Sequence, residues 1–120
     1  TTGNGVIYKI SELGENYEIL HNFGDSEYDG LQPYGSLVLT SKNEFYGMTR
    51  DGGEYNFGTI FRILPKGKKY KTLFSFTNET GGNPIDNLTP SRDGCVFYGL
   101  TQGNTTYVPN GSIFRFVPKK

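Results

Sequence analysis

One six-residue motif occurs three times in the chain at a fixed spacing. The sequence reads GVIYKI from Gly5, GTIFRI from Gly58 and GSIFRF from Gly111, so successive leading glycines are 53 residues apart. A motif that recurs at a fixed spacing of a few tens of residues is the signature of repeat architectures. The 120 residues therefore hold three copies of the motif but only two whole periods.

Other segments superpose at nearly the same step. YEILHNF (17–23) falls on YKTLFSF (70–76), and EFYGMT (44–49) matches VFYGLT (96–101) after a slip of one residue. DGLQP from Asp29 corresponds to GGNP from Gly81. The length differences fall in Gly-rich or Asn-rich connections, where insertions are tolerated best.

Each recurring piece has the pattern of a short strand. In GTIFRI, Ile60 and Phe61 point to opposite sides, as do Arg62 and Ile63, and no stretch has a useful helical period. Seventeen Gly, nine Tyr and nine Phe suit a β-protein with many tight turns. The repeat unit is predicted as four antiparallel strands at 36–41, 44–49, 58–63 and 70–76.

Four antiparallel strands in about 40–50 residues describe one blade of a β-propeller. We therefore predict an all-β fold of propeller blades, with two blades plus one redundant strand in a single repeat domain, 1–120. Residues 1–30 would supply the third and fourth strands of a first blade, and 31–76 a complete blade. Residues 77–120 would supply the first to third strands of a following blade.

The spaced pattern of FYGMT or FYGLT, Gly-Gly, GTIFRI and LFSF resembles the bacterial GloVer tandem repeat, which is named from Gloeobacter and Verrucomicrobia. That repeat occurs in choice-of-anchor surface proteins, and the resemblance covers nearly the whole chain. It implies an extracytoplasmic β-propeller and no particular reaction. The chain departs from the pattern at KNE (42–44), which replaces an Asp-Gly turn, and at QGNTTYVPN (102–110), which replaces a Gly-Gly loop.

Two blades cannot cover their own apolar faces, because propellers close with roughly 4–8 blades. Open edge strands also pair readily with other chains. Three alternatives follow: a piece of a longer propeller, a closed ring of copies, or a filament built by strand exchange. We expect a non-enzymatic structural module, extracellular or on the cell surface, whose partners are copies of itself. The expected assembly residues are Val6, Ile7, Tyr8, Ile113, Phe114 and Phe116.

Composition narrows the classes of function. Twelve basic and twelve acidic residues cancel, which argues against a nucleic-acid partner. No apolar run approaches the ~20 residues of a membrane span. The start at Thr1, without Met or signal peptide, indicates a processed form or a piece of a longer protein. Cys95 is the only cysteine and is expected to be a half-buried strand residue, with a reactive or intermolecular thiol as the alternative.

Few residues suggest catalysis or metal binding. Asp25, Glu27 and Asp29 alternate before a glycine, like the opening of a calcium loop, but Ser36 stands where the final Glu is needed. An ordinary acidic turn is the alternative. His21 is expected to be a partly exposed residue of an outer strand. With no metal-ligand cluster and no nucleophile–base pair in the sequence, we expect no catalytic residue and no cofactor.

Aromatic residues in loops are the candidates for ligand binding. Five lie outside or at the ends of the predicted strands: Tyr28, Tyr34, Tyr55, Phe57 and Tyr107. Such rings can stack on sugars, which makes a lectin-like propeller the alternative function. They can equally pack the seam between blades. A fragment of a larger propeller enzyme is the remaining alternative.

Four Asn-x-Ser/Thr sequons are candidates for glycosylation: Asn78, Asn87, Asn104 and Asn110. Most fall in predicted loops, where glycans are tolerated. The alternative is that they only reflect loops rich in Asn and Thr.

Overall fold

The computed structural model describes residues 3–64, 66, 69–103 and 105–118, and nine strands lie within these ranges. The first sheet pairs β1 (Val6–Lys9) with β2 (Glu18–Asn22). The central sheet contains, in chain order, β3 (Gly30–Leu39), β4 (Phe45–Gly52), β5 (Thr59–Leu64) and β6 (Lys69–Ser75). The third sheet contains β7 (Thr89–Pro90), β8 (Phe97–Thr101) and β9 (Ser112–Phe116).

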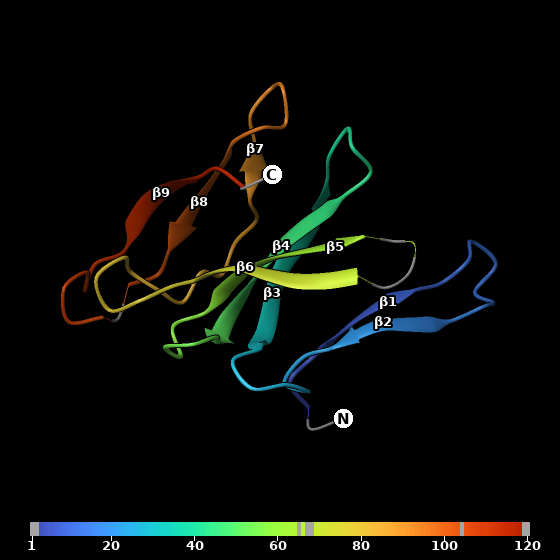
Figure 1. The fold of residues 1–120 in the computed structure, drawn as a ribbon, viewed down its shortest axis with the longest axis horizontal. Coiled ribbons are helices and arrows are strands. Elements are labelled where there is room, and N and C mark those ends of the chain that lie inside the picture. The colour runs from blue at the N-terminus through green and yellow to red at the C-terminus, as the bar shows by residue number, and fades with distance from the viewer. Residues whose placement is uncertain (1–2, 65, 67–68, 104, 119–120) are drawn as a thin grey trace.

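The prediction of an all-β fold is confirmed, and every strand pair is antiparallel. Figure 1 shows the central sheet lying between the other two, with the β1–β2 hairpin projecting on one side. The three sheets are open, and the described residues close no ring. The closure of a propeller and the division into blades therefore stay predictions.

The first strand of the central sheet is longer than the sequence suggested. The prediction began it at Ser36, whereas β3 begins at Gly30 and pairs with β4 from its first residue. Glycine and proline in this segment read as a loop, but β4 continues to Gly52 and so provides a partner for the first half of β3. An irregularity in register between Tyr34 and Val38 accommodates the change. Tyr34 is consequently a strand residue, and its placement in a loop was wrong.

The glycine that opens each copy of the motif has a structural reason. Gly5, Gly58 and Gly111 have φ of 105°, 100° and 92°, a conformation that side chains strongly disfavour. A Cβ on Gly58 would also collide with the backbone carbonyl of Thr49. In the central and third sheets the third strand thus starts against the second, whereas a Cβ on Gly5 would collide with the Pro33 ring.

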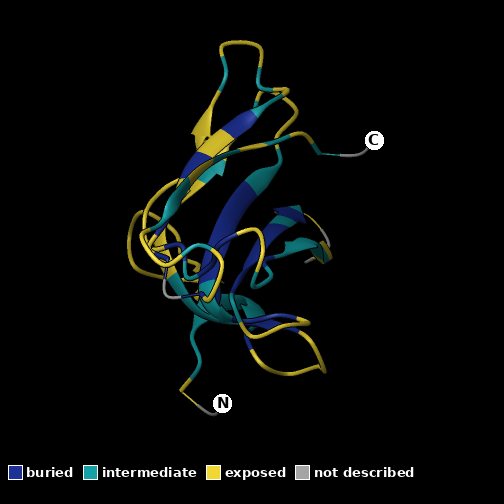
Figure 2. Ribbon diagram, turned by 90° about the vertical axis from the view of Figure 1, so that its left-hand side faces the viewer, coloured by how far each residue is buried: buried dark blue, intermediate teal, exposed yellow. Residues whose placement is uncertain are grey.

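The core of the protein lies on both sides of the central sheet. Ile60 belongs to a cluster shared with the third sheet, whereas Phe61 and Ile63 belong to a cluster shared with the first sheet. All three side chains are at most 1 % exposed. In Figure 2 the buried residues accordingly concentrate in the central strands, and the outer sheets carry more exposed residues. Among the described residues, only the central sheet is covered on both of its faces.

Cys95 was expected in a strand, and this was wrong. It lies exposed in the turn between β7 and β8, and its amide donates a hydrogen bond to Asp93 Oδ1 at 3.0 Å. Ser91 Oγ also donates to Asp93 Oδ1, at 2.7 Å. These hydrogen bonds extend the turn, so β8 begins only at Phe97.

Candidate functional site

The first sheet repeats the outer half of the central sheet residue by residue. β1 and β2 pair as Val6↔Asn22, Ile7↔His21, Tyr8↔Ile19 and Lys9↔Glu18. β5 and β6 pair 53 residues later as Thr59↔Ser75, Ile60↔Phe74, Phe61↔Thr72 and Arg62↔Lys71. Even the irregularity in register recurs, after Ile7 and after Ile60. The shared register therefore identifies equivalent positions in the two sheets independently of the sequence alignment.

Successive sheets pack in the same way. We call the side of a sheet that faces its C-terminal neighbour the leading face, and the opposite side the trailing face. The leading face of the central sheet presents Tyr46, Met48, Ile60 and Phe76 to the third sheet. Its trailing face presents Phe45, Phe61, Ile63 and Tyr70 to the first sheet.

Ring geometry shows how closely the two seams agree. Phe23 of the first sheet contacts Phe61 with ring centroids 5.4 Å apart and planes at 63°. Phe76 contacts Phe114 at 5.3 Å and 65°, which is the same contact 53 residues later. Edge-to-face pairs of this kind stabilise each seam beyond the area that they bury. A single packing rule therefore relates the first sheet to the central sheet and the central sheet to the third.

The leading face of the third sheet has no neighbour among the described residues. By the same equivalence, Tyr98, Leu100 and Ile113 correspond to Tyr46, Met48 and Ile60 of the central sheet. The first three are 44 %, 50 % and 80 % exposed, whereas their counterparts are at most 4 % exposed. This face is thus apolar by composition and open in this structure.

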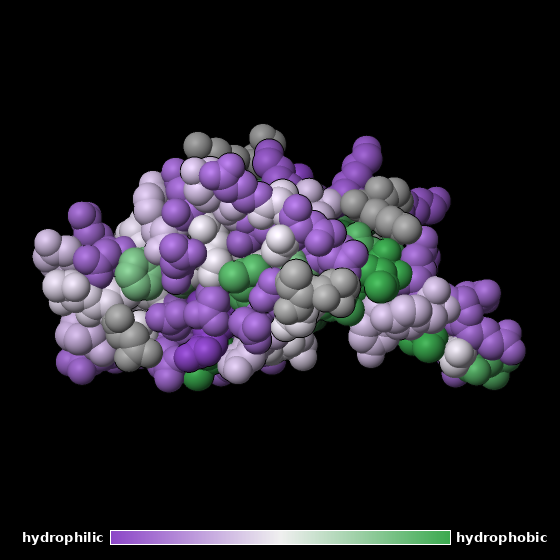
Figure 3. Space-filling model, turned by 90° about the horizontal axis from the view of Figure 1, so that it is seen from below, coloured by the Kyte–Doolittle hydropathy of each residue, from purple (hydrophilic) through white to green (hydrophobic). Residues whose placement is uncertain are grey.

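The trailing face of the first sheet is open as well. Tyr8, Ile10 and Tyr17 correspond to Phe61, Ile63 and Tyr70, and all three are exposed. The Tyr8 and Tyr17 rings lie 5.5 Å apart at 32°, and the Phe61 and Tyr70 rings 5.3 Å apart at 32°. In Figure 3 apolar surface shows beside the projecting β1–β2 hairpin.

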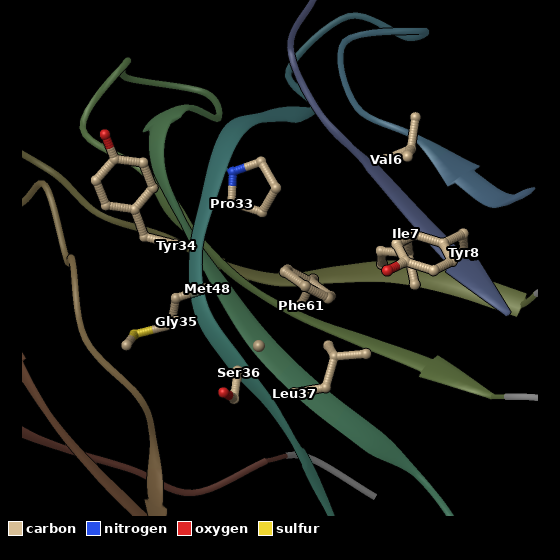
Figure 4. A pocket seen from close by; sticks show the side chains of 11 residues that line it. Val6, Ile7, Tyr8, Pro33, Tyr34, Gly35, Ser36, Leu37, Met48 and Phe61 are labelled. Carbon is tan, nitrogen blue, oxygen red and sulfur yellow. The ribbon is translucent and has the colours of Figure 1, made fainter. Parts of the chain in front are cut away.

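A hollow of about 260 Å³ lies over the trailing face of the central sheet beside β1. We call it the β1 hollow; it is lined by Val6, Ile7, Tyr8, Pro33, Tyr34, Gly35, Ser36, Leu37, Gly47, Met48 and Phe61. In Figure 4 the Leu37 side chain points toward β1 and the Met48 side chain points away from it. By the packing rule above, a first and a second strand of the first sheet would be expected on this side of β3 and β4.

A sequence profile of the Gloeobacter/Verrucomicrobia repeat matches residues 1–120. The chain belongs to this repeat family. No curated protein and no solved structure matches it. The resemblance noted from the spaced motifs is confirmed for the repeat family, whereas the propeller that it implies is still a prediction.

The predicted assembly residues of this Gloeobacter/Verrucomicrobia repeat chain divide into two groups. Tyr8 and Ile113 are exposed and belong to the open faces. Ile7, Phe114 and Phe116 pack inside the seams of the chain, and Val6 is half-buried. Sequence reasoning missed Tyr98, Leu100, Ile10 and Tyr17, although the 53-residue alignment with buried central positions would have found them.

His21 is more than a partly exposed outer-strand residue. Its Nε2 lies 2.9 Å from Asp29 Oδ2, and its side chain is 16 % exposed. Its ring stacks on Tyr70 at 3.5 Å and 7°, across the seam. Burial is the main cause that raises the pKa of the Tyr70 hydroxyl, so this ring remains neutral. The sequence carried no signal for this contact, because Tyr70 is remote along the chain.

The acidic loop is organised around the chain itself. The Asp29 carboxylate is buried and accepts hydrogen bonds from the amides of Gly24 and Gly30 at 2.9 and 2.8 Å, in addition to its contact with His21. Asp25 and Glu27 are exposed. Among the described residues there is no group of three or more His, Cys, Asp or Glu side chains that could hold a metal ion. Asp29 thus anchors the turn after β2.

The loop aromatics do not converge on one site. Tyr28 and Tyr107 are exposed, Tyr34 lies 6.0 Å from the Arg50 guanidinium, and Phe57 is half-buried against the seam with the third sheet. Two candidates do meet, because Tyr55 and Phe57 line a hollow of about 480 Å³. Its other lining residues are Thr77, Asn78 and Glu79.

The sequons have different surroundings. Asn78 Oδ1 accepts a hydrogen bond from the Thr106 amide at 2.7 Å, and Asn87 Oδ1 accepts one from the Ser36 amide at 2.6 Å. Asn110 is exposed, and Asn104 lies outside the described residues. None of the described residues forms a helix long and apolar enough to cross a membrane.

Proposed function

We propose that the chain is a non-enzymatic, extracellular structural module that assembles head to tail with copies of itself. In this proposal the copies join through the open sheet faces and by completing unfinished sheets, and the sheets act as propeller blades. The observation that carries the proposal is the contrast at equivalent positions. Ile113 is 80 % exposed where Ile60 is 1 % exposed, and Tyr8 is 57 % exposed where Phe61 is 1 % exposed.

The physical driving force is the burial of these apolar faces, at about 25 cal/mol per Å² removed from water. The leading and trailing faces are different surfaces, so the contact is heterologous. Such a contact closes into a ring if the rotation between copies allows it, and otherwise extends into a filament. The extracellular placement rests on the resemblance to choice-of-anchor surface proteins and is tested by fractionating the source cells.

Particle mass tests the proposal directly. Light scattering of the purified 120-residue chain is expected to give multiples of 13.4 kDa. A single discrete multiple means a ring, whereas a broad distribution with fibres in negative stain means a filament. A monomer at all accessible concentrations contradicts the proposal.

A matched pair of variants locates the contact. Ile113→Asp places a charge on the open leading face, and Leu13→Asp places one in the turn between β1 and β2, where the side chain is 85 % exposed. Both changes leave the folded core untouched, so both variants are expected to fold as the parent chain does. Only Ile113→Asp is expected to shift the mass to the monomer. Assembly of Ile113→Asp like that of Leu13→Asp would exclude the leading face as the contact.

The hollow beside Tyr55 favours carbohydrate binding as a second candidate function. An exposed ring beside the polar side chains of Thr77, Asn78 and Glu79 offers both a stacking platform and hydrogen-bonding groups. A glycan array tests it: binding is expected to disappear in Tyr55→Ala and to persist in Tyr107→Ala, because Tyr107 does not line this hollow. Equal loss in both variants, or no binding by the parent chain, contradicts it.

A further inference from the structure

Strands β1, β5 and β9 are three copies of the third strand of the repeat, one more than two complete units need. We ask which of β1 and β9 is displaced when two chains assemble. This inference rests on the proposed head-to-tail assembly. Within the central sheet, β5 has β4 on one edge and β6 on the other. Among the described residues, β9 has only β8 as a neighbour, and β1 has only β2. Within the described residues, the third sheet therefore contains no fourth strand, and the first sheet contains no first or second strand.

The register of the central sheet can be transferred to the open edge of β9. β8 and β9 pair as Thr101↔Ser112 and Phe97↔Phe116, just as β4 and β5 pair as Thr49↔Thr59 and Phe45↔Ile63. β2 is the repeat equivalent of β6. If β2 of a second copy takes the place of β6, the pairs are Ser112↔Asn22, Ile113↔His21, Phe114↔Ile19 and Arg115↔Glu18.

Two polar groups favour this register. Glu18 forms an ion pair with Lys9 at 3.3 Å in the first sheet, and the transferred register again places a cation, Arg115, opposite it. Asn22 Oδ1 is buried and has no hydrogen-bond partner among the described residues. Its present cross-strand partner, Val6, is apolar, whereas the transferred partner, Ser112, carries a hydroxyl. Cross-strand pairs of opposite charge and of polar side chains stabilise a sheet.

A pair of hydroxyl groups indicates whether β9 or β1 lies beside β8 in the assembled sheet. Thr49 Oγ1 and Thr59 Oγ1 lie 2.7 Å apart between β4 and β5. Thr101 Oγ1 and Ser112 Oγ lie 2.7 Å apart between β8 and β9, at the equivalent positions. The equivalent residue in β1 is Val6, which has no hydroxyl, so exchanging β9 for β1 would leave Thr101 without this partner. β9 is retained, and β1 is the strand released.

The β1 hollow is accounted for by the same exchange. In the seam between the central and third sheets, Tyr46 of β4 packs on Phe97 of β8 with ring centroids 4.4 Å apart. Tyr98 and Leu100 of β8 need a similar surface. The first sheet as described, with β1 and β2 alone, does not offer it. The central sheet of the next copy offers it at the β1 hollow, once β1 has left.

We propose that β9 of one copy pairs with β2 of the next copy and releases β1. The resulting four-stranded sheet combines β7, β8 and β9 of one copy with β2 of its neighbour. Its leading face covers the β1 hollow of that neighbour. The partner at the open edge is a second copy of this chain.

A reversible lock between β1 and β2 tests the exchange. In a Cys95→Ser background, Lys9→Cys with Glu18→Cys joins two cross-strand partners, and Arg62→Cys with Lys71→Cys joins the equivalent partners of β5 and β6. Cross-strand Cα separations of about 4.5–5.5 Å suit a disulfide. Oxidised Lys9→Cys/Glu18→Cys is expected to stay a 13.4 kDa monomer and to assemble on reduction. The central-sheet variant is expected to assemble in both states. Equal assembly of the first variant in both states overturns the exchange.

An intermolecular crosslink tests the register. Arg115→Cys with Glu18→Cys, in the same background, is expected to give a ladder of covalently joined copies on a non-reducing gel. Arg115→Cys with Asn22→Cys puts the second thiol at the other end of β2 and is expected to give none. Assembly without the ladder means that another strand covers β9 and overturns the exchange alone. A monomeric Cys95→Ser chain overturns both the exchange and the proposed function.

Discussion

The first sheet and the outer half of the central sheet have the same strand register, but their trailing faces have opposite surroundings. Their strands pair in one register, and their trailing aromatic rings lie at the same 32°. Tyr8 is nevertheless 57 % exposed, and its counterpart Phe61 is 1 % exposed. The burial of the trailing rings therefore depends on whether a neighbouring sheet is present. The pairing of the strands that carry these rings is the same with or without that neighbour.

The largest test of this comparison removes one ring from each sheet. Phe61→Ala is expected to lower the free energy of unfolding by about 3–5 kcal/mol, because it leaves a cavity in a closed seam. Tyr8→Ala is expected to cost about 0.5 kcal/mol in the monomer, because its ring is largely in water. Urea denaturation of the two variants in an Ile113→Asp background gives both values without assembly. Equal costs would contradict the conclusion that the neighbouring sheet decides the burial of these rings.

A second test compares the two buried hydroxyl pairs. The Thr49 hydroxyl lies 2.7 Å from Thr59 Oγ1, accepts from the Thr59 amide at 3.1 Å and donates to the Asp51 carbonyl at 3.0 Å. Thr49→Val is therefore expected to cost about 1–3 kcal/mol of unfolding free energy. Thr101→Val is expected to cost less, because the Thr101 hydroxyl lies in the less enclosed third sheet. Denaturant midpoints measure both, and a larger loss in Thr101→Val would reverse the ranking.

A third test measures how the free energy of unfolding changes with pH. At neutral pH the substitution that it uses, Tyr70→Phe, is expected to have a smaller effect than those above. Burial raises the pKa of Tyr70, so the folded protein holds this proton above the pH at which an unfolded tyrosine loses it. Since the unfolded state then binds fewer protons, stability falls as pH rises above about 10. Tyr70→Phe is expected to reduce this loss by up to about 1.4 kcal/mol per pH unit. Tyr107→Phe, at an exposed ring, is expected to leave the slope unchanged in urea titrations at several pH values.

The sequence pattern predicted a strand well where that strand pairs with the next strand along the chain. The segments 44–49, 58–63 and 70–76 correspond to β4, β5 and β6 with small shifts at their ends. Alternation and turn residues suffice there, because each strand pairs with its sequence neighbour. The start of β3 was missed because Pro33 and Gly35 resemble a loop until β4 provides a partner.

The open faces were harder to predict than the strands. Tyr98 and Leu100 are ordinary strand residues by pattern, and only the missing neighbour makes them candidates for contact. The contact of His21 with Asp29 and Tyr70 depends on how two sheets meet, which no local pattern encodes. Sequence therefore predicted the repeating unit. The structure was needed to distinguish the sheet faces that pack in a seam from the faces that are exposed.

Main-chain hydrogen bonds take part in both joints between sheets. The Gln32 amide donates to the Asn4 carbonyl at 2.9 Å, and the Asn83 amide donates to the Phe57 carbonyl at 2.8 Å. Gln32 and Asn83 both have a φ of 58°. Because these two hydrogen bonds use no side-chain atoms, substitutions of the aromatic rings in the seams are expected to weaken the adhesion of neighbouring sheets and to leave both hydrogen bonds in place. The direction in which one sheet follows the next therefore depends less on the identity of the rings in the seams than the strength of the seams does.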